Sequence, residues 1–213
     1  MYFLSKDLFF PTVSQASTGG ILAVGGDLSI ERLQLAYKNG IFPWFDDNEP
    51  ILWWAPPMRM VVVPQTYKVS KSIRNLLNQN KFEVTFNQSF KSVILHCQNI
   101  KRKGQEGTWI SNEIVAQYCE LHKLGVAKSV EVWQNKKLVG GLYGIDLGHV
   151  FCGESMFSIV ANASKIAFVT LVEYLKNNNY NLLDCQVHNY HLESLGAFEI
   201  PRNEFMEILI KNQ

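Results

Sequence analysis

KSVEVWQNKKLVGGLYGIDLGHVFCGESMFS, residues 128–158, is the stretch that decides the fold of this 213-residue chain. It contains three runs rich in β-branched and aromatic residues, separated by short turns, over residues 128–133, 138–145 and 150–156. Such runs predict three consecutive antiparallel strands. Gly140, Gly141 and Gly144 fall inside the second strand, where glycine marks a bulge or a close approach of the backbone.

A helix and a fourth strand are predicted after these three strands. The helix is expected to begin near Asn162 or Ser164 and to reach about Lys176, and the strand to span Asn181 to Cys185. Because a helical crossover returns the chain in the same direction, the fourth strand is predicted to lie parallel to the third. The fold class is therefore α/β (α+β) with a mixed sheet, in an order that resembles the acyl-CoA N-acetyltransferase (GNAT-like) fold. Further helices are predicted upstream, at residues 70–80, 90–97 and 111–123.

Residues 1–61 are predicted to form a small, aromatic and turn-rich N-terminal domain, followed by the larger domain over residues 62–213. Ser29 is expected to cap a short helix that ends before Gly40. Three tryptophans stand among prolines in this segment: Trp44, Trp53 and Trp54. Because proline disfavours regular strand pairing, these rings are not expected to form a strand. They could form a stacking platform, or they could fill the core, which is the commoner use of tryptophan.

The composition is typical of a soluble globular protein. Hydrophobic residues make up 47% of the chain and aromatic residues 12%, which suffices for a packed core. The N-terminus lacks a secretory signal, and no apolar run approaches the ~20 residues that span a bilayer, so a cytoplasmic location without membrane association is expected. The cysteines have no paired spacing and are expected to be reduced thiols in the core: Cys97, Cys119, Cys152 and Cys185.

Positive charge is concentrated in one segment, although the net charge of the chain is only +1. Residues 64–103 hold eight basic side chains against a single acid, Glu83. The basic residues are Lys68, Lys71, Arg74, Lys81, Lys91, Lys101, Arg102 and Lys103. A polyanion bound on one face is one interpretation of this segment, and an ordinary solvated surface is the other.

Polar residues on two neighbouring strands form the candidate site. Glu154 interrupts an apolar strand, and a buried glutamate is costly unless it is hydrogen-bonded or belongs to a polar site. Asp184 and Gln186 follow the apolar part of the parallel strand, where strands splay and binding sites form. By strand alternation, Asp184 and Gln186 are predicted to share one face, with the Asp184 carboxylate accepting from the Gln186 amide. Cys185 is predicted to face the core.

Other chemistries are conceivable at the same place in the chain. Cys185 could act as a nucleophile with His188 or His191 as its base, but no oxyanion-hole signature accompanies it. The same three residues could bind zinc, but a structural zinc site needs four ligands and a second pair is missing. A CoA-dependent enzyme would carry an Arg/Gln-x-x-Gly-x-Gly pyrophosphate loop after the third strand. FSIVANASK, residues 157–165, stands there instead.

Long motifs in a fixed order over nearly the whole chain resemble the leucyl/phenylalanyl-tRNA–protein transferases of bacteria. The motifs are GGILAVGGDLS (19–29), LAYKNGIFPWF (35–45), LWWAP (52–56), GTWIS (107–111), SVEVW (129–133), LVGGLYG (138–144), CGESMFS (152–158), NASK (162–165), and DCQV (184–187) with HLESLGAFEIPR (191–202). The resemblance implies transfer of Leu or Phe, and less readily Met, from aminoacyl-tRNA to the α-amine of proteins that begin with Arg or Lys, which marks them for degradation. It also implies a small N-terminal domain before an acetyltransferase-like domain.

The resemblance also implies a binding site for the end of the aminoacyl-tRNA. Trp44 and Trp109 are expected to hold the 3′-terminal adenosine, because an aromatic face stacks on any unpaired base. Seven apolar residues are expected to line the pocket for the amino-acid side chain: Leu142, Phe151, Met156, Phe168, Leu171, Leu175 and Leu183.

Reacting and charged groups are assigned in the same way. Glu154, Asp184 and Gln186 are expected to face the reacting ester. The basic residues expected to contact tRNA are Lys68, Lys71 and Arg74. Glu154 is also expected to meet the cationic first residue of the acceptor protein, with help from Asp46, Asp47 and Glu49.

The sequence therefore predicts an aminoacyltransferase without a metal or nucleotide cofactor. ATP is not expected to be required, because replacing an ester by an amide is downhill. Two alternatives stay open: an acyl-CoA-dependent N-acyltransferase of the same fold, and a non-catalytic RNA-binding protein. The missing pyrophosphate loop counts against the first alternative. The cluster of carboxylates and amide counts against the second.

Overall fold

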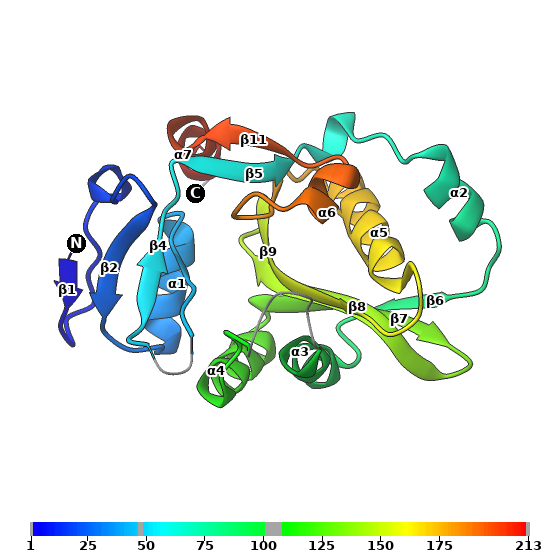
Figure 1. Ribbon diagram of the computed structural model, residues 1–213, viewed down its shortest axis with the longest axis horizontal. Helices are drawn as coiled ribbons and strands as arrows, with labels where there is room; N and C mark the ends of the chain where they lie inside the picture. Colours follow the sequence, from blue (N-terminus) through cyan, green and yellow to red (C-terminus); the bar gives the residue numbers. More distant parts are fainter. Residues whose placement is uncertain (1, 47–48, 101–107, 212–213) are drawn as a thin grey trace.

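The computed structural model describes residues 2–46, 49–100 and 108–211, and within them the chain forms two sheets. The small sheet lies near the N-terminus, and the large sheet is built by the remaining chain (Figure 1). The small sheet with helix α1 stands at one end of the molecule, and helix α2 lies at the other end (Figure 1).

The small sheet has the strand order β1-β2-β4-β3. Its strands are β1 (Tyr2–Leu4), β2 (Ile21–Gly25), β3 (Phe42–Pro43) and β4 (Leu52–Trp54). A short 3-10 helix (Val13–Gln15) precedes β2, and α1 (Ile30–Lys38) follows it. Ser29 stands at the predicted N-cap position, but its hydroxyl donates to Asp27 instead of capping the helix. The expectation that prolines would keep this aromatic segment out of a strand is wrong. Strand β4 ends at Trp54, two residues before Pro56, and it pairs with β2 and β3.

The large sheet has the order β11-β5-β10-β9-β8-β7-β6. Its strands are β5 (Met58–Val62), β6 (Glu83–Phe86), β7 (Ala127–Gln134), β8 (Lys137–Asp146), β9 (Val150–Ser158), β10 (Leu182–Asp184) and β11 (Phe198–Pro201). The pairs β7–β8 and β8–β9 are antiparallel and β10 is parallel to β9, as the sequence predicted. The mixed-sheet fold class is thereby confirmed.

Strand β5 comes early in the chain but pairs at the far side of the large sheet. It lies between β10 and β11 and is antiparallel to both, so it extends the sheet beyond β10, and β11 forms the edge. The predicted domain boundary between residues 61 and 62 falls inside this strand. A short 3-10 helix (Pro64–Thr66) then carries the chain away toward α2 (Lys71–Leu77).

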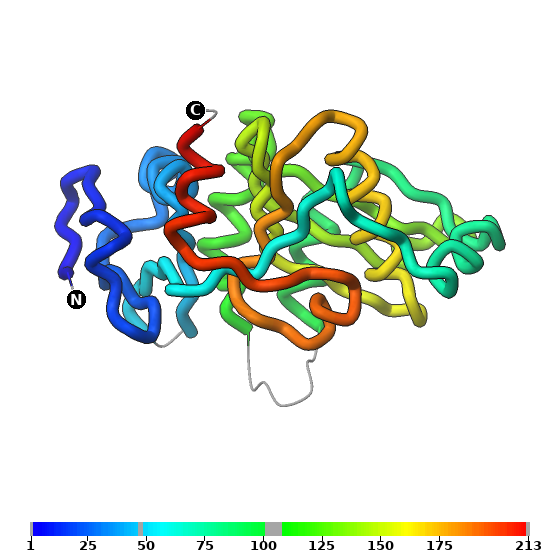
Figure 2. Tube along the Cα trace, turned by 90° about the horizontal axis from the view of Figure 1, so that it is seen from above, coloured from blue at the N-terminus to red at the C-terminus, as the bar shows by residue number. Residues whose placement is uncertain are grey.

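Helices cover both faces of the large sheet (Figures 1 and 2). α3 (Phe90–Asn99) and α4 (Asn112–Lys123) pack on one face, and α5 (Ala163–Asn177) packs on the other. α6 (Tyr190–Ser194) and α7 (Arg202–Ile210) flank β11. The start of α5 comes so near β8 that a Cβ at Gly140 would lie 2.5 Å from the Cβ of Ala163. The predicted close approach of the backbone at Gly140 is therefore confirmed.

Candidate active site

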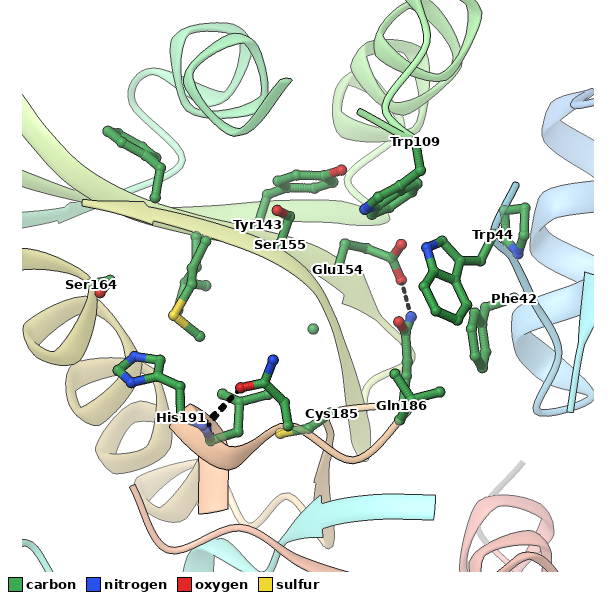
Figure 3. Close-up of a pocket in the computed structure, with 18 of the residues that line it drawn as sticks. Phe42, Trp44, Trp109, Tyr143, Glu154, Ser155, Ser164, Cys185, Gln186 and His191 are labelled. Carbon is green, nitrogen blue, oxygen red and sulfur yellow. Dashed lines mark hydrogen bonds between the residues drawn. The ribbon is translucent and has the colours of Figure 1, made fainter. Parts of the chain in front are cut away.

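A pocket of about 790 Å³ opens between the small sheet, β9 and the chain that follows β10 (Figure 3). Phe42 and Trp44 enter it from the small sheet, and Glu154 and Ser155 enter it from β9. β10 leaves β9 after the pair Asp184–Cys152, so the two strands diverge at this point. The divergence leaves room for a ligand between them, as is usual where parallel strands separate.

A β-bulge directs Glu154 into this pocket. On β8 and β9, Tyr143 is opposite Ser155 and Gly144 is opposite Gly153, so Glu154 is the extra residue of the bulge. Gly144 makes the bulge possible, because a Cβ there would lie 2.2 Å from the Cys152 carbonyl oxygen. The expectation of a bulge or a close backbone approach within the second strand is thus confirmed at Gly144 as well.

Gln186 reaches Glu154 from the loop that follows β10, through a left-handed backbone conformation. Its φ is +66°, and its backbone N–H donates to Asp184 Oδ1 at 2.8 Å. A non-glycine residue adopts this conformation at a cost of about 1 kcal/mol or more, so the carboxylate and the β5 backbone hold it there. Met60 N–H donates to the Gln186 carbonyl at 3.1 Å. The side-chain Nε2 of Gln186 then donates to Glu154 Oε1 at 2.6 Å (Figure 3).

Glu154 has the properties of a group that can exchange a proton near neutral pH. Burial raises its pKa to about 7, and the charge of Asp184 adds to the rise. Hydrogen bonds from Tyr37, Tyr118 and Gln186 oppose the rise. A carboxylate whose conjugate acid has a pKa near the working pH is well suited to accept a proton from an ammonium group.

The side-chain amide of Gln186 donates to Glu154 and not to Asp184, which corrects the sequence-based expectation. The Asp184 carboxylate is fully buried and faces away from the pocket, where Arg59 Nε donates to Oδ1 at 2.9 Å and Arg59 NH2 to Oδ2 at 2.8 Å. Arg59 also donates to the Gly40 carbonyl at 2.9 Å and lies over the rings of Phe42 and Phe205. Asp184 therefore anchors the site from behind. The place beside the Gln186 side-chain amide, which was predicted for Asp184, is occupied by Glu154.

Cys185 lines the pocket, which also differs from the expectation of a core position. The left-handed turn at Gln186 breaks the strand alternation on which that expectation rested. Burial, and then the charge of Asp184, raises the pKa of the Cys185 thiol, so the thiol stays protonated and is a poor nucleophile. His188 contacts Glu193 and the Tyr190 ring, and His191 lies in the pocket wall.

Aromatic side chains form one end of the pocket. Trp44 is 40% exposed and Trp109 only 8%, and both line the pocket beside Glu154 and Gln186 (Figure 3). The Trp54 ring lies 5.4 Å from the Trp44 ring, and its Nε1 donates to the Trp44 carbonyl oxygen at 2.6 Å. The two tryptophans expected to stack on a base are thus brought to one place, and Trp54 fixes the backbone that carries Trp44.

Apolar side chains from the sheet and from α5 form the other part of the wall. Five of the seven predicted residues line the pocket: Leu142, Met156, Phe168, Leu171 and Leu183. Phe151 and Leu175 are buried but are not among the residues that line it. Both pack in the core on the α5 side of the sheet. The expectation that they line the pocket is therefore wrong. Ser164 and His191 add polar groups at this end (Figure 3).

The predicted tRNA-contacting residues lie away from the pocket. Lys68, Lys71 and Arg74 are exposed, on α2 or just before it, and none lines the pocket. Among the acidic residues expected to meet the acceptor, Asp46 and Glu49 line the pocket rim. The expected contributions of Asp47 and of the basic residues 101–103 lie outside the described residues.

Three residues at the site were missed by the sequence analysis: Arg59, Tyr37 and Tyr118. Arg59 follows two prolines and shows no spacing that links it to Asp184, whose position is 125 residues later. The two tyrosines follow the helical periodicity of core residues, so nothing distinguishes their hydroxyls in the sequence.

Three further properties concern the described part of the chain. No group of three or more His, Cys, Asp and Glu side chains in it has the arrangement to hold a metal ion. Its helices include none with both the length and the apolar character needed to traverse a bilayer. The cysteines at positions 97, 119, 152 and 185 are free thiols.

The chain matches one family over most of its length. A model described as leucyl/phenylalanyl-tRNA protein transferase matches residues 61–210, and a model of the N-terminal domain of the same protein matches residues 26–57. Leucyl/phenylalanyl-tRNA–protein transferase of Flavobacterium johnsoniae is 68% identical over 98% of this chain and 99% of the relative. The protein of that name from Flavobacterium psychrophilum is 59% identical over 99% and 100%, and that from Thermodesulfovibrio yellowstonii is 50% identical over 98% and 85%.

The fold has a counterpart among solved structures. The crystal structure of FemX covers 84% of this chain and 70% of its own, with a TM-score of 0.52 and 12% identity. At this identity the likeness concerns the fold alone.

Proposed function

The chain belongs to the leucyl/phenylalanyl-tRNA protein transferase family and is an aminoacyltransferase, and we propose that it moves leucine, phenylalanine and, less readily, methionine from aminoacyl-tRNA to the α-amine of proteins that begin with Arg or Lys. One observation carries this proposal. A single pocket joins an aromatic end, a carboxylate–amide pair and an apolar end in that order (Figure 3). These are the groups that an aminoacyl-adenosine and an attacking amine would need.

The donor is proposed to bind with its adenosine at the aromatic end. Trp44 and Trp109 would stack on the base, because ring faces bind unpaired bases with little dependence on sequence. The ester would then lie beside Glu154 and Gln186, and the amino-acid side chain would enter the part of the pocket lined by Leu142, Met156 and Phe168. The exposed cations of α2 are proposed to contact phosphates of the tRNA body.

The acceptor is proposed to enter from the rim that carries Asp46 and Glu49. Carboxylates on this side favour a cationic first residue, and charge complementarity of this kind sets specificity and the rate of association. Glu154 would receive the α-ammonium group next to the ester.

Proton transfer can be followed through the reaction. An α-ammonium group has a pKa of about 7.7–8.0 and enters mostly protonated at neutral pH. Glu154, whose pKa is raised to about 7 by burial, takes one proton and leaves a neutral amine. The amine nitrogen attacks the ester carbonyl carbon, the bond to the ribose oxygen breaks, and the second proton of the amine ends on that ribose oxygen. Because the Gln186 NH₂ is bound to Glu154, its carbonyl oxygen is the group that can accept from the attacking amine.

The cellular part of the proposal follows the family. Extension of proteins beginning with Arg or Lys by Leu or Phe would mark them for degradation, and the reaction would take place in the cytoplasm, where aminoacyl-tRNA is made. Neither a metal nor a nucleotide cofactor enters the proposed steps.

The test is incubation of the protein with labelled Leu-tRNA and a peptide that begins with Arg, followed by mass analysis of the peptide. We expect an increase in mass by one leucine residue, abolished when the ester of the donor is first hydrolysed by mild base. A matched peptide beginning with Ala should be extended poorly. Leucine transfer from leucyl-CoA but not from Leu-tRNA would support the acyl-CoA alternative, and RNA binding without transfer would support the RNA-binding alternative.

A further inference from the structure

Two tyrosines lie directly behind Glu154, and they come from different parts of the fold. Tyr37 belongs to α1 beside the small sheet, Tyr118 belongs to α4, and both are nearly or fully buried. The Tyr118 hydroxyl donates to Glu154 Oε2 at 3.3 Å, and the hydroxyls of Tyr37 and Tyr118 form a hydrogen bond with each other. With Gln186 on Oε1, the carboxylate is therefore held from both sides.

The charges around Glu154 act in opposite directions on its ionised form. The charge of Asp184 on β10 opposes it, while the Cys152 thiol on β9 is kept protonated, because burial raises the pKa of that thiol well above its usual value. Arg59 on β5 is the cation that reaches it, but the guanidinium is already bound to the Asp184 carboxylate and to the Gly40 carbonyl. The neutral donors are therefore the groups that directly contact and favour the carboxylate.

Resting on the proposed function, we propose that Tyr37 and Tyr118 are positioning residues that keep Glu154 ionised and directed at Gln186. The α1 helix of the N-terminal unit thereby sets the lowest pH at which the enzyme can take a proton from its acceptor. The N-terminal unit has a second task besides presenting aromatic rings to the donor.

The physical reason is the competition between burial and hydrogen bonding. Burial favours the neutral acid, whereas each hydroxyl that donates to the carboxylate favours the ionised form. Burial first, and then the charge of Glu154, raises the pKa of both tyrosines well above its usual range. Both side chains therefore remain hydroxyl donors over the whole range in which transfer can be measured.

A purely structural role gives a different signature. If the tyrosines only fill space, replacement by phenylalanine lowers the rate by the same factor at every pH. If they keep Glu154 ionised, their removal raises the pKa of Glu154, so the loss is large at low pH and disappears at high pH. The pH profile of kcat/KM separates the two because it reports the free enzyme and the free acceptor, and the acceptor is unchanged between variants.

The experiment measures kcat/KM for an Arg-initiated peptide between pH 6 and pH 9 in wild type, Y37F, Y118F and the double variant. We expect the rising limb to move upward by roughly 0.5 to 1 unit in the variants. For a move of one unit from a limb near 7, transfer at pH 6.5 falls about eightfold, and transfer at pH 9 changes by less than twofold. Y180F is the matched control, because Tyr180 is also buried but its hydroxyl donates to Asp146 at 2.7 Å, outside the pocket.

The limb of Y180F should coincide with that of wild type. A loss of equal factor at all pH values, or no loss at all in the double variant, would overturn the inference while leaving the transferase activity in place. An inactive wild type would instead refute the proposed function. Circular dichroism melts of each variant check that a reduced rate does not come from an unfolded protein. In the E154Q background, Y37F and Y118F should no longer move the rising limb of the pH profile.

Discussion

Two carboxylates lie at the junction of β9 and β10, and their surroundings are opposite. Asp184 sits behind β10, fully buried and bound through both oxygens to Arg59. Glu154 sits in front, in the wall of the pocket, where an amide and a hydroxyl contact it. The region behind the strand is a fixed ion pair, and the region in front holds a group that can change its charge.

The difference shows how environment, and not residue type, assigns a role. A buried carboxylate that a guanidinium binds through both oxygens is fixed in place, so it serves to hold the local structure. Burial raises the pKa of the Glu154 carboxylate to about 7, and neutral hydrogen-bond donors offset only part of this rise, so Glu154 can accept a proton near pH 7. Asp184 supports the left-handed backbone of Gln186, and Gln186 in turn aims at Glu154.

The largest expected effect concerns the region behind the strand. Arg59→Met leaves Asp184 buried without its partner and should lower the free energy of unfolding by about 3–5 kcal/mol. Urea denaturation measures it. The matched control is Lys123→Met, which removes an exposed ion pair with Glu120 and should leave stability nearly unchanged. An Arg59→Met protein as stable as wild type would show that the pair behind β10 does not anchor the fold.

The next effect concerns the region in front. Gln186→Ala removes the group proposed to receive the attacking amine and should lower transfer by on the order of 10²-fold, because the transition state then lacks one of its hydrogen-bond acceptors. Single-turnover transfer from preformed Leu-tRNA measures it. The adjacent Cys185→Ala is the control and should stay active, since no thiol chemistry is proposed. An inactive, folded Cys185→Ala beside an active Gln186→Ala would revive the nucleophilic cysteine.

A smaller effect is expected in the apolar part of the pocket. Leu142, Met156 and Leu171 line the pocket. We propose that this wall accepts side chains unbranched at Cβ, whereas a branched side chain would collide near the ester. Such a mismatch is worth about 1–3 kcal/mol, so Leu, Phe and Met should be transferred in preference to Ile and Val. Competition between matched aminoacyl-tRNAs measures the ratio. Equal transfer of Leu and Ile would place the side chain elsewhere.

The smallest effect lies far from both carboxylates. Replacing Lys71 and Arg74 by alanine should lower the slope of log K for tRNA against log salt by roughly 0.7 to 0.9 for each phosphate that is no longer neutralised. Transfer from a short aminoacyl-adenosine donor is the control and should not change. An unchanged slope would mean that the tRNA body binds another surface of the molecule.

Much of this arrangement could be predicted from the sequence because it rests on local patterns. The strands β7, β8 and β9 show strand-like runs with clear turns, and α5 followed by β10 forms a crossover whose direction is fixed by chain geometry. Glu154 was recognisable as a charge in an apolar strand, and Gly144 as a glycine within one.

The remainder depended on contacts between distant segments. Strand β5 brings Arg59 to Asp184 across 125 residues, and no local pattern signals that pairing. The left-handed residue Gln186 interrupts the strand alternation, so the side chains around it point in directions that the period of two does not give. Phe151 and Leu175 have the same apolar character as the residues of the pocket wall, and only the packing of α5 on the sheet separates the two sets.

The most direct test of the contrast between the two carboxylates is a paired measurement on Glu154→Gln and Asp184→Asn. Both the single-turnover transfer rate and the free energy of unfolding are determined at pH 7.5. Glu154→Gln should lose transfer by about 10²-fold or more, because the proton acceptor is removed. It should keep its stability, because the amide is isosteric and removes a buried charge. That charge disfavours the folded state as pH rises from about 4.5 to 7, since burial raises the pKa of Glu154. Asp184→Asn should lose stability, since Arg59 is left unpaired, with a smaller loss of rate. The opposite pattern, an unstable Glu154→Gln with full activity and a stable but inactive Asp184→Asn, would contradict the assignment.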